Sequence, residues 1–259
     1  MNSSLRIGLT VISLSLCLTP LISSGSWEAA DEPSVNEIIK KIDLLYRSKS
    51  SYAEIEMEIT TPHWQRTLAM NIWTEEMEKT LIRITAPKKE QGVATLRIGS
   101  EMWNYLPKTN KVVKVPPSMM MSSWMGSDFT NDDLVKEFSL FEDYSYEFAS
   151  PEDGREDLYY IKCIPREDLA VVWGYIVIAC RKNDYLPVWQ KYYDEKDNLM
   201  RILSYSDIRA FDGRTIPAVM EMVPQNKEGH KTTIRYVKAR FDVDIDEDMF
   251  SLRRLRSRP

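Results

Sequence analysis

Apolar and polar residues alternate along most of the chain with a spacing of two. In residues 53–60, Ile55, Met57 and Ile59 alternate with glutamates. This pattern is typical of an antiparallel β-strand with one buried face and one face in water. Similar runs recur at short spacing with turn residues between them, so we expect a β-meander. The expected strands cover residues 53–60, 66–76, 78–87, 92–99, 101–107, 111–117, 144–150, 157–165, 173–182, 186–196, 199–213, 214–224 and 231–244.

The number of expected strands indicates that the sheet curls, because an open sheet rarely exceeds about ten strands while staying flat. Several strands are also apolar on both sides. In residues 173–182, Tyr175 and Val177 would face one way, and Ile176 and Ile178 the other. Such strands have both faces covered, or one face lines an apolar hollow. The pattern leaves a dense core and a cavity both open.

A change of period predicts one helix near the start of the folded part. Apolar residues recur at spacings of three and four over residues 35–49, including Ile38 and Ile42. Ser34 and Glu37 occupy the positions of a capping box. The helix therefore has one apolar face to bury against the sheet.

A methionine-rich segment, residues 119–134, interrupts the series of strands. Ser118 can cap a short helix that runs to about Met125 and stops at Gly126. Thr130 can cap a second short helix, with acidic residues near the positive end of its dipole. We therefore expect two short helices that are joined at a glycine.

The apolar side chains of this segment suit either a core or a ligand. Methionine is unbranched and polarizable, so it moulds to irregular apolar shapes. The same pattern is expected for a core helix that fills the open side of a sheet and for a lid over an apolar ligand. The spacing of the apolar residues does not distinguish these two alternatives. For the lid, the candidate ligand-binding residues are Met119, Met120, Met121, Trp124, Met125, Phe129, Trp103 and Tyr105.

The N-terminus is typical of a secretory signal. Arg6 precedes an apolar run that is too short to span a membrane comfortably, and small residues follow it. We expect residues 1–30 to be cleaved as a signal peptide, together with Cys17, and residues 31–259 to form one domain. An uncleaved anchor is the alternative.

Export would place Cys163 and Cys180 in an oxidising compartment. These two cysteines fall on neighbouring expected strands. A disulfide between them is one interpretation, and two separate buried thiols is the other.

The charge pattern argues against nucleic acid as a partner. The formal net charge is -5, and no basic stripe appears before residues 251–259. We expect that basic tail to be a solvated end, with contact to a membrane surface as the alternative.

The motifs of common enzyme classes are missing from the sequence, which has no GxSxG, HExxH, CxxC, Walker-type or GxGxxG pattern. The two histidines, His63 and His230, lie far apart. The acids of residues 128–137 match no calcium loop, and helix capping explains three of them. We therefore expect no enzyme, no metal site and no cofactor. These acids are Asp128, Asp132, Asp133 and Glu137.

One phrase carries a family likeness. The sequence EMWNYLPKTNKVVKVPPSMMMSSWMGSDFTNDDLVKE, residues 101–137, follows an early helix and a meander, and DEDMFSL closes the domain at residues 246–252. These features resemble the LolA-like outer membrane lipoprotein-sorting proteins, in the branch found beside RND-type exporters. The resemblance implies a mainly β fold with a few helices (α+β). Its strongly curved antiparallel sheet would form an incomplete β-barrel, with helices covering the open concave side.

The same resemblance implies a function without chemistry. Such a protein would be a periplasmic carrier or chaperone that holds lipid or lipoprotein acyl chains in an apolar hollow. The implied partners are an inner-membrane RND-type exporter and an outer-membrane acceptor. The alternative is a periplasmic sensor or regulatory module of the same architecture that binds a membrane protein partner.

Overall fold

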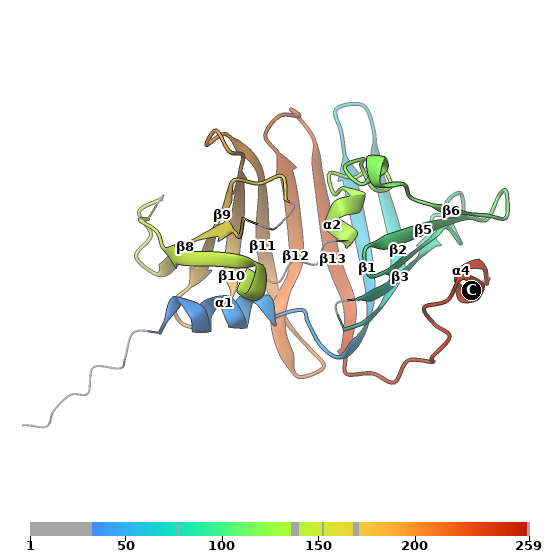
Figure 1. Ribbon diagram of the computed structural model, residues 1–259, viewed down its shortest axis with the longest axis horizontal. Helices are drawn as coiled ribbons and strands as arrows, with labels where there is room; N and C mark the ends of the chain where they lie inside the picture. The colour runs from blue at the N-terminus through green and yellow to red at the C-terminus, as the bar shows by residue number, and fades with distance from the viewer. Residues whose placement is uncertain (1–32, 77, 136–139, 152, 168–170, 258–259) are drawn as a thin grey trace, which may run out of the picture. The chain divides into compact units, whose positions relative to one another are not determined.

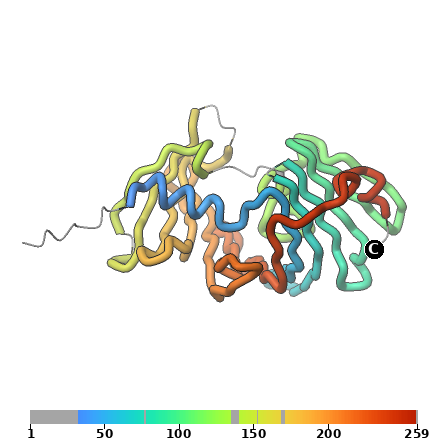
Figure 2. The backbone as a smooth tube through the Cα atoms, turned by 90° about the horizontal axis from the view of Figure 1, so that it is seen from below, coloured from blue at the N-terminus to red at the C-terminus, as the bar shows by residue number. Residues whose placement is uncertain are grey.

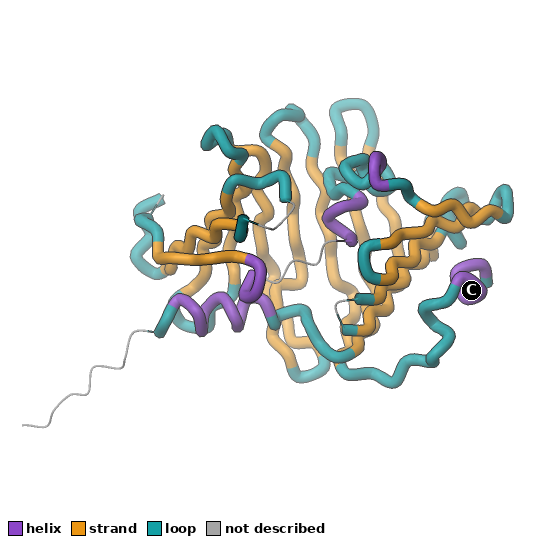
Figure 3. The backbone as a smooth tube through the Cα atoms, viewed as in Figure 1, coloured by secondary structure: helices purple, strands orange, loops and turns teal. Residues whose placement is uncertain are grey.

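The computed structural model describes most of the chain after the expected signal peptide, and strands make up about half of the described backbone (Figure 3). The expected signal peptide, residues 1–30, and Cys17 lie outside the described residues. The described residues are 33–76, 78–135, 140–151, 153–167 and 171–257.

The strands form one antiparallel sheet (Figure 1). Their bounds are β1 Ser50–Thr60, β2 Gln65–Glu75, β3 Lys79–Ala86, β4 Ala94–Ile98, β5 Glu101–Leu106, β6 Lys111–Lys114, β7 Tyr144–Phe148, β8 Leu158–Pro165, β9 Tyr175–Arg181, β10 Pro187–Tyr193, β11 Leu199–Phe211, β12 Arg214–Pro224 and β13 Lys231–Phe241. The order across this 13-stranded sheet is β6-β5-β4-β3-β2-β1-β13-β12-β11-β10-β9-β8-β7. The helical elements are α1 Val35–Asp43, the 3-10 turn η1 Pro117–Met119, α2 Asn131–Val135, α3 Leu140–Asp143 and α4 Leu252–Arg256.

The two edges of the sheet are β6 and β7, so the sheet does not close into a barrel. Figures 1 and 2 show the strands curving around one face, called the concave face below. The expected fold class, a mainly β chain that forms an incomplete barrel with a few short helices, is confirmed.

The centre of the sheet joins the first strand to the last. Ser51 of β1 pairs with Phe241 of β13, and the antiparallel ladder continues to Thr60 and Lys231. The alternation expected in β1 is present, because its apolar side chains lie buried on the concave face among those of β2 and β3.

Helix α1 covers the concave face at the β7 end of the sheet. Its capping box is present, with Glu37 N donating to Ser34 Oγ at 3.3 Å and Ser34 N to Glu37 Oε2 at 3.1 Å. Ile38, Ile39 and Ile42 pack against apolar side chains of β7, β8 and β9. The helix ends at Asp43, earlier than expected, and the chain then runs on as a turn.

The segment between the two edge strands also lies over the concave face. Residues 117–135, called the cover below, contain no helix of the kind expected before Gly126, only the turn η1. Met125 and Gly126 have positive φ, and Trp124 N donates to Phe129 O at 2.8 Å. The backbone bonds therefore run between the two halves of a folded-back loop instead of along a helix.

The second expected helix is present as α2. Thr130 N donates to Asp133 Oδ2 at 2.8 Å, and Asp133 N donates back to Thr130 Oγ1 at 3.1 Å. This reciprocal pair is the predicted cap. Asp128 has a different role: its N–H donates to Thr232 Oγ1 of β13 at 2.9 Å, and that hydroxyl donates to Asp128 Oδ2 at 2.8 Å. Glu137 lies outside the described residues.

Helix α4 packs on the opposite, convex face of the sheet, which differs from the solvated tail that we expected. Leu255 is fully buried there against β3, β4 and β5. The guanidinium of Arg83 donates to the carbonyls of Arg254 at 2.8 Å and Ser257 at 2.7 Å. These bonds satisfy carbonyls at the end of the helix and hold the basic segment in place.

Candidate functional site

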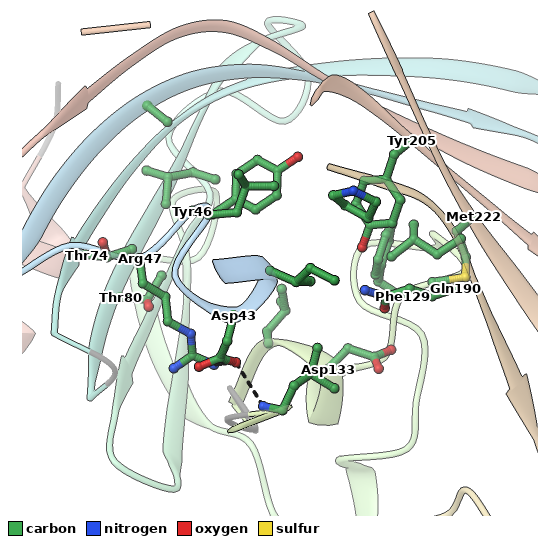
Figure 4. A pocket seen from close by; sticks show the side chains of 18 of the residues that line it. Asp43, Tyr46, Arg47, Thr74, Thr80, Phe129, Asp133, Gln190, Tyr205 and Met222 are labelled. Atoms are coloured by element: carbon green, nitrogen blue, oxygen red, sulfur yellow. Dashed lines mark hydrogen bonds and ion pairs between the residues drawn. The ribbon is translucent and has the colours of Figure 1, made fainter. Parts of the chain in front are cut away.

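A cavity of about 480 Å³ lies between the concave face and the elements that cover it (Figure 4). Its walls come from β1 to β3, β7, β9 to β13, α1 with the turn after it, α3, residues 171–173 and the cover. This volume falls within the range of small-molecule sites in proteins. The apolar part of the lining includes Ile42, Ala53, Ile72, Ile82, Met121, Phe129, Leu134, Leu203 and Met222.

Strand periodicity explains which side chains reach the cavity. Arg201, Leu203 and Tyr205 of β11 lie two residues apart and all face inward. Gln190 and Tyr192 of β10 do the same. Successive side chains of a strand point to opposite faces, so each of these strands contributes a lining residue at every second position.

A buried ion pair joins the cover to β11. Arg201 Nη1 and Nη2 donate to Asp133 Oδ2 and Oδ1 at 2.9 and 2.8 Å. The guanidinium carbon lies 4.3 Å from the ring centre of Trp173 and 4.4 Å from that of Tyr192. Burial raises the pKa of the Asp133 carboxyl, but Arg201 and the hydrogen bonds from Thr130 hold this pKa below its usual value. The pair is therefore charged at neutral pH.

A second ion pair closes the wall beside α1. Arg47 Nη2 lies 3.1 Å from Asp43 Oδ1, and Leu140 N donates to the same oxygen at 2.8 Å (Figure 4). Tyr46 lies next to them in the sequence, and its hydroxyl donates to Pro217 O at 2.8 Å. The early end of α1 thus places Tyr46 in the cavity wall.

Two of the candidate residues line the cavity, Met121 and Phe129 of the cover. Met121 is 51% exposed, and Val172, which also lines the cavity, is 46% exposed. A side chain that both lines a cavity and is half exposed lies at its rim. The rim is therefore apolar at Met121 and Val172.

The neighbouring methionines of the cover lie outside the cavity lining. Met119 is 49% exposed, and Met120 is partly buried. Backbone carbonyls of both hold the cover together: Met119 O accepts from Asn131 Nδ2 at 3.0 Å and Met120 O from Asp132 N at 2.8 Å.

Trp124 belongs to the core beneath the cover. It is 5% exposed and packs among the apolar side chains of β1, β2 and β3, with Met125 against the same cluster. Its Nε1 donates to Thr95 Oγ1 of β4 at 3.2 Å. Trp124 therefore anchors the cover to the sheet, which was the alternative that spacing left open.

Trp103 and Tyr105 lie on the convex face, away from the cavity. Both pack in the cluster of β3, β4 and β5 beneath α4. Their placement corrects the expectation, because the alternation of β5 turns Met102 and Asn104 toward the concave face instead. Nothing in the sequence of so short a strand determines which of its two sides faces inward.

Cys163 and Cys180 are buried free thiols, so the alternative of two separate thiols holds. Cys163 pairs with Ile176 and Cys180 with Tyr159, which sets the two cysteines four residues apart along the ladder. At about 3.4 Å per residue, this offset exceeds the span of a disulfide. Burial raises the pKa of both thiols to about 12, with a contribution from Cys180 at Cys163 and from Asp184 at Cys180.

Sequence patterns missed most of the polar lining. Arg201 and Gln190 occupy inward-facing positions of β11 and β10, where the alternation of the strand predicts an apolar residue. A charged or polar residue at such a position is the sequence signal that could have identified them. In the described part of the chain, no helix is long and apolar enough to cross a membrane.

Comparison with known proteins agrees with this architecture. A family model, described only as that of an uncharacterized protein, matches residues 76–257. No curated protein matches the sequence. A crystal structure of a DUF1329 family protein from Desulfovibrio piger is 24% identical with a TM-score of 0.74, over 85% of this chain and 97% of that one.

Two further solved structures share the fold. A putative outer membrane lipoprotein-sorting protein domain from Vibrio parahaemolyticus is 22% identical with a TM-score of 0.72, over 86% of this chain and 98% of that one. A LolA superfamily protein from Nitrosomonas europaea is 18% identical with a TM-score of 0.70, over 86% and 99%. The chain therefore belongs to the family of uncharacterized proteins that the family model describes, and its fold is that of the LolA-like lipoprotein-sorting proteins.

Proposed function

We propose that this protein is a periplasmic carrier or chaperone that binds the acyl or lipid part of an apolar cargo in the cavity. It passes this cargo between components of the cell envelope without chemical change. The observation that carries the proposal is the cavity of about 480 Å³ between the concave face and the cover, with an apolar rim at Met121 and Val172.

The energetics of burial favour such a ligand. Each methylene that leaves water contributes about 0.8 kcal/mol, so an acyl chain gains binding free energy from contact with an apolar wall alone. Met121 and Phe129 belong to the cover and Leu203 and Met222 to the sheet, so a bound chain would lie between the two. The methionine side chains adapt to chains of different shape.

The proposed exchange partners come from the family likeness. An inner-membrane RND-type exporter would supply or receive the cargo on one side, and an outer-membrane acceptor on the other. The fold shared with lipoprotein-sorting proteins supports lipoproteins or lipids as cargo.

The test is to purify the full chain from the cell envelope under mild conditions and to extract it with organic solvent. We expect lipid in the extract by mass spectrometry, and saturable displacement of a fluorescent fatty acid by acyl lipids after delipidation. An extract without lipid, together with no saturable binding, would contradict the proposal. A membrane protein that is captured equally well by the delipidated chain would instead support the sensor alternative.

A further inference from the structure

The cavity wall carries two hydrogen-bond donors that have no acceptor in the described part of the chain. Gln190 is 7% exposed and lines the cavity, and its Oε1 accepts from the Tyr192 hydroxyl at 2.8 Å. Its Nε2 amide has no acceptor among the residues that the structure describes. The hydroxyl of Tyr205, which lines the same wall, is likewise without a partner there (Figure 4).

The two donors are neighbours on one face of the sheet. Gln190 of β10 pairs directly with Leu203 of β11, and Tyr205 lies two residues further along β11. Diagonal neighbours of this kind are about 7–8 Å apart at the backbone, within reach of long side chains. On the other side, Leu203 pairs with Met222 of β12, so two apolar side chains lie beside the donors.

An unpaired donor in such a place penalises a purely hydrocarbon ligand. Water in the cavity can satisfy the Gln190 amide and the Tyr205 hydroxyl, but an alkyl chain that displaced it would leave both unsatisfied. A ligand that brings an acceptor to this position avoids that penalty. Burial and the neighbouring Tyr192, Tyr46 and Tyr236 raise the pKa of Tyr205 well above its usual value, so its hydroxyl keeps its proton.

The charges of the lining favour a neutral acceptor. Arg201 is paired with Asp133, and Arg47 with Asp43. Among the lining residues that the structure describes, acidic and basic side chains are equal in number, so these residues give no net positive charge to attract a carboxylate or phosphate. The charged lining residues are Asp43, Asp132, Asp133, Arg47, Arg201 and Arg240.

We propose that the cavity takes an acyl chain together with its ester or amide carbonyl, and that Gln190 Nε2 and the Tyr205 hydroxyl bind the carbonyl oxygen. This inference rests on the proposed function. The proposed ligand is an acylated molecule whose ester or amide carbonyl enters the cavity together with the chain. A plain hydrocarbon lacks this carbonyl, and a free fatty acid anion carries a charge.

The test compares two lipids that differ only at the carbonyl, monopalmitoylglycerol and its ether analogue 1-O-hexadecylglycerol, as competitors of a fluorescent fatty acid. We expect the ester to bind about three- to tenfold more tightly, the effect of one or two net hydrogen bonds. Palmitate forms a third arm and should bind no more tightly than the ester.

Three variants assign the effect to the named groups. Tyr205→Phe and Gln190→Met should each bring the ratio of ester to ether affinity toward one. The control is Tyr46→Phe, which also lines the cavity but whose hydroxyl already donates to Pro217 O, and it should keep the ratio. Because Gln190→Met also frees the Tyr192 hydroxyl, Tyr205→Phe remains the deciding variant if Gln190→Met fails to fold.

Equal binding of ester and ether by the wild-type protein, or an unchanged ratio in Tyr205→Phe, would overturn the inference while leaving the carrier function intact. Failure to bind any of the lipids would count against the carrier function itself. A palmitoylated lipopeptide compared with monopalmitoylglycerol then shows whether the acyl group comes from a lipoprotein or a free glycerolipid.

Discussion

Asp133 and Arg201 form a bidentate ion pair between the cover and the sheet, with N–O distances of 2.8 and 2.9 Å. Asp133 lies in the first turn of α2, and Arg201 lies near the start of β11. The pair closes one side of the cavity, so its strength bears on how readily the cover leaves the sheet.

Asp133→Asn should destabilise the protein by about 3 kcal/mol, because it leaves the Arg201 guanidinium largely buried without its counter-charge. Chemical denaturation measures the free energy of unfolding. The matched control is Glu221→Gln, which breaks the more exposed pair with Lys231 and should change stability by less than about 1 kcal/mol. A double-mutant cycle with Arg201→Met separates the ion pair from the cap at Thr130. A coupling energy near zero would show that only the cap matters.

Stability should fall in acid through the same carboxyl. The pKa of Asp133 is lowered in the folded state, so its contribution is fully present above the unfolded value of about 3.9 and is lost as pH falls through the folded value. In denaturation curves from pH 7 to pH 2, the stability difference between wild type and Asp133→Asn should therefore shrink as the pH falls below about 3.9. A difference that stays constant down to pH 2 would contradict this assignment.

Met121→Asp should weaken binding of a fluorescent fatty acid by at least tenfold, because it places a charge at the apolar rim of the cavity. Met119→Asp is the matched control: it is the same change in the same segment at similar exposure, but outside the lining. Met119→Asp should leave the dissociation constant within about twofold. Equal losses in the two variants would mean that the rim does not contact the ligand.

Trp124→Ala should lower the free energy of unfolding by about 3–5 kcal/mol, the usual range for removing a large buried aromatic side chain. It also removes the donor to Thr95. Thermal unfolding provides the measurement, and Trp64→Ala is the control, since Trp64 lies in the turn between β1 and β2 and is 44% exposed. Similar small effects in both would show that Trp124 is not an anchor.

Cys163 and Cys180 should resist alkylation in the native protein at pH 8, because burial holds both thiol pKa values at about 12. After denaturation without reductant, both should react fully. Peptide mapping by mass spectrometry follows each residue separately. A peptide containing both cysteines joined by a disulfide would contradict the register of β8 and β9.

Local patterns predicted the local structure well. Alternation in residues 53–60 gave β1, and the capping boxes at Ser34 and Thr130 marked the starts of α1 and α2. These signals lie within a few residues of one another, so the sequence contains them directly.

Features that depend on long-range packing were harder to predict. The helix expected before Gly126 is a folded-back loop. Trp124 is buried in the core of β1 to β3, and the free energy gained by this burial outweighs the local preference for a helix. Trp103 and Tyr105 face the convex side because α4, distant in the sequence, supplies apolar side chains there. Gln190 and Tyr205 become neighbours only through the pairing of β10 with β11.

The pairing of β1 with β13 has a consequence for how the chain folds. Residue 51 lies beside residue 241, so the central ladder cannot form until nearly the whole domain is available. Contacts this distant in sequence carry a large loop-closure entropy and slow the folding of β-rich chains. We therefore expect the two halves of the sheet to assemble as separate hairpin arrays, and the union of the first and last strands to be the late, rate-limiting event that creates the cavity.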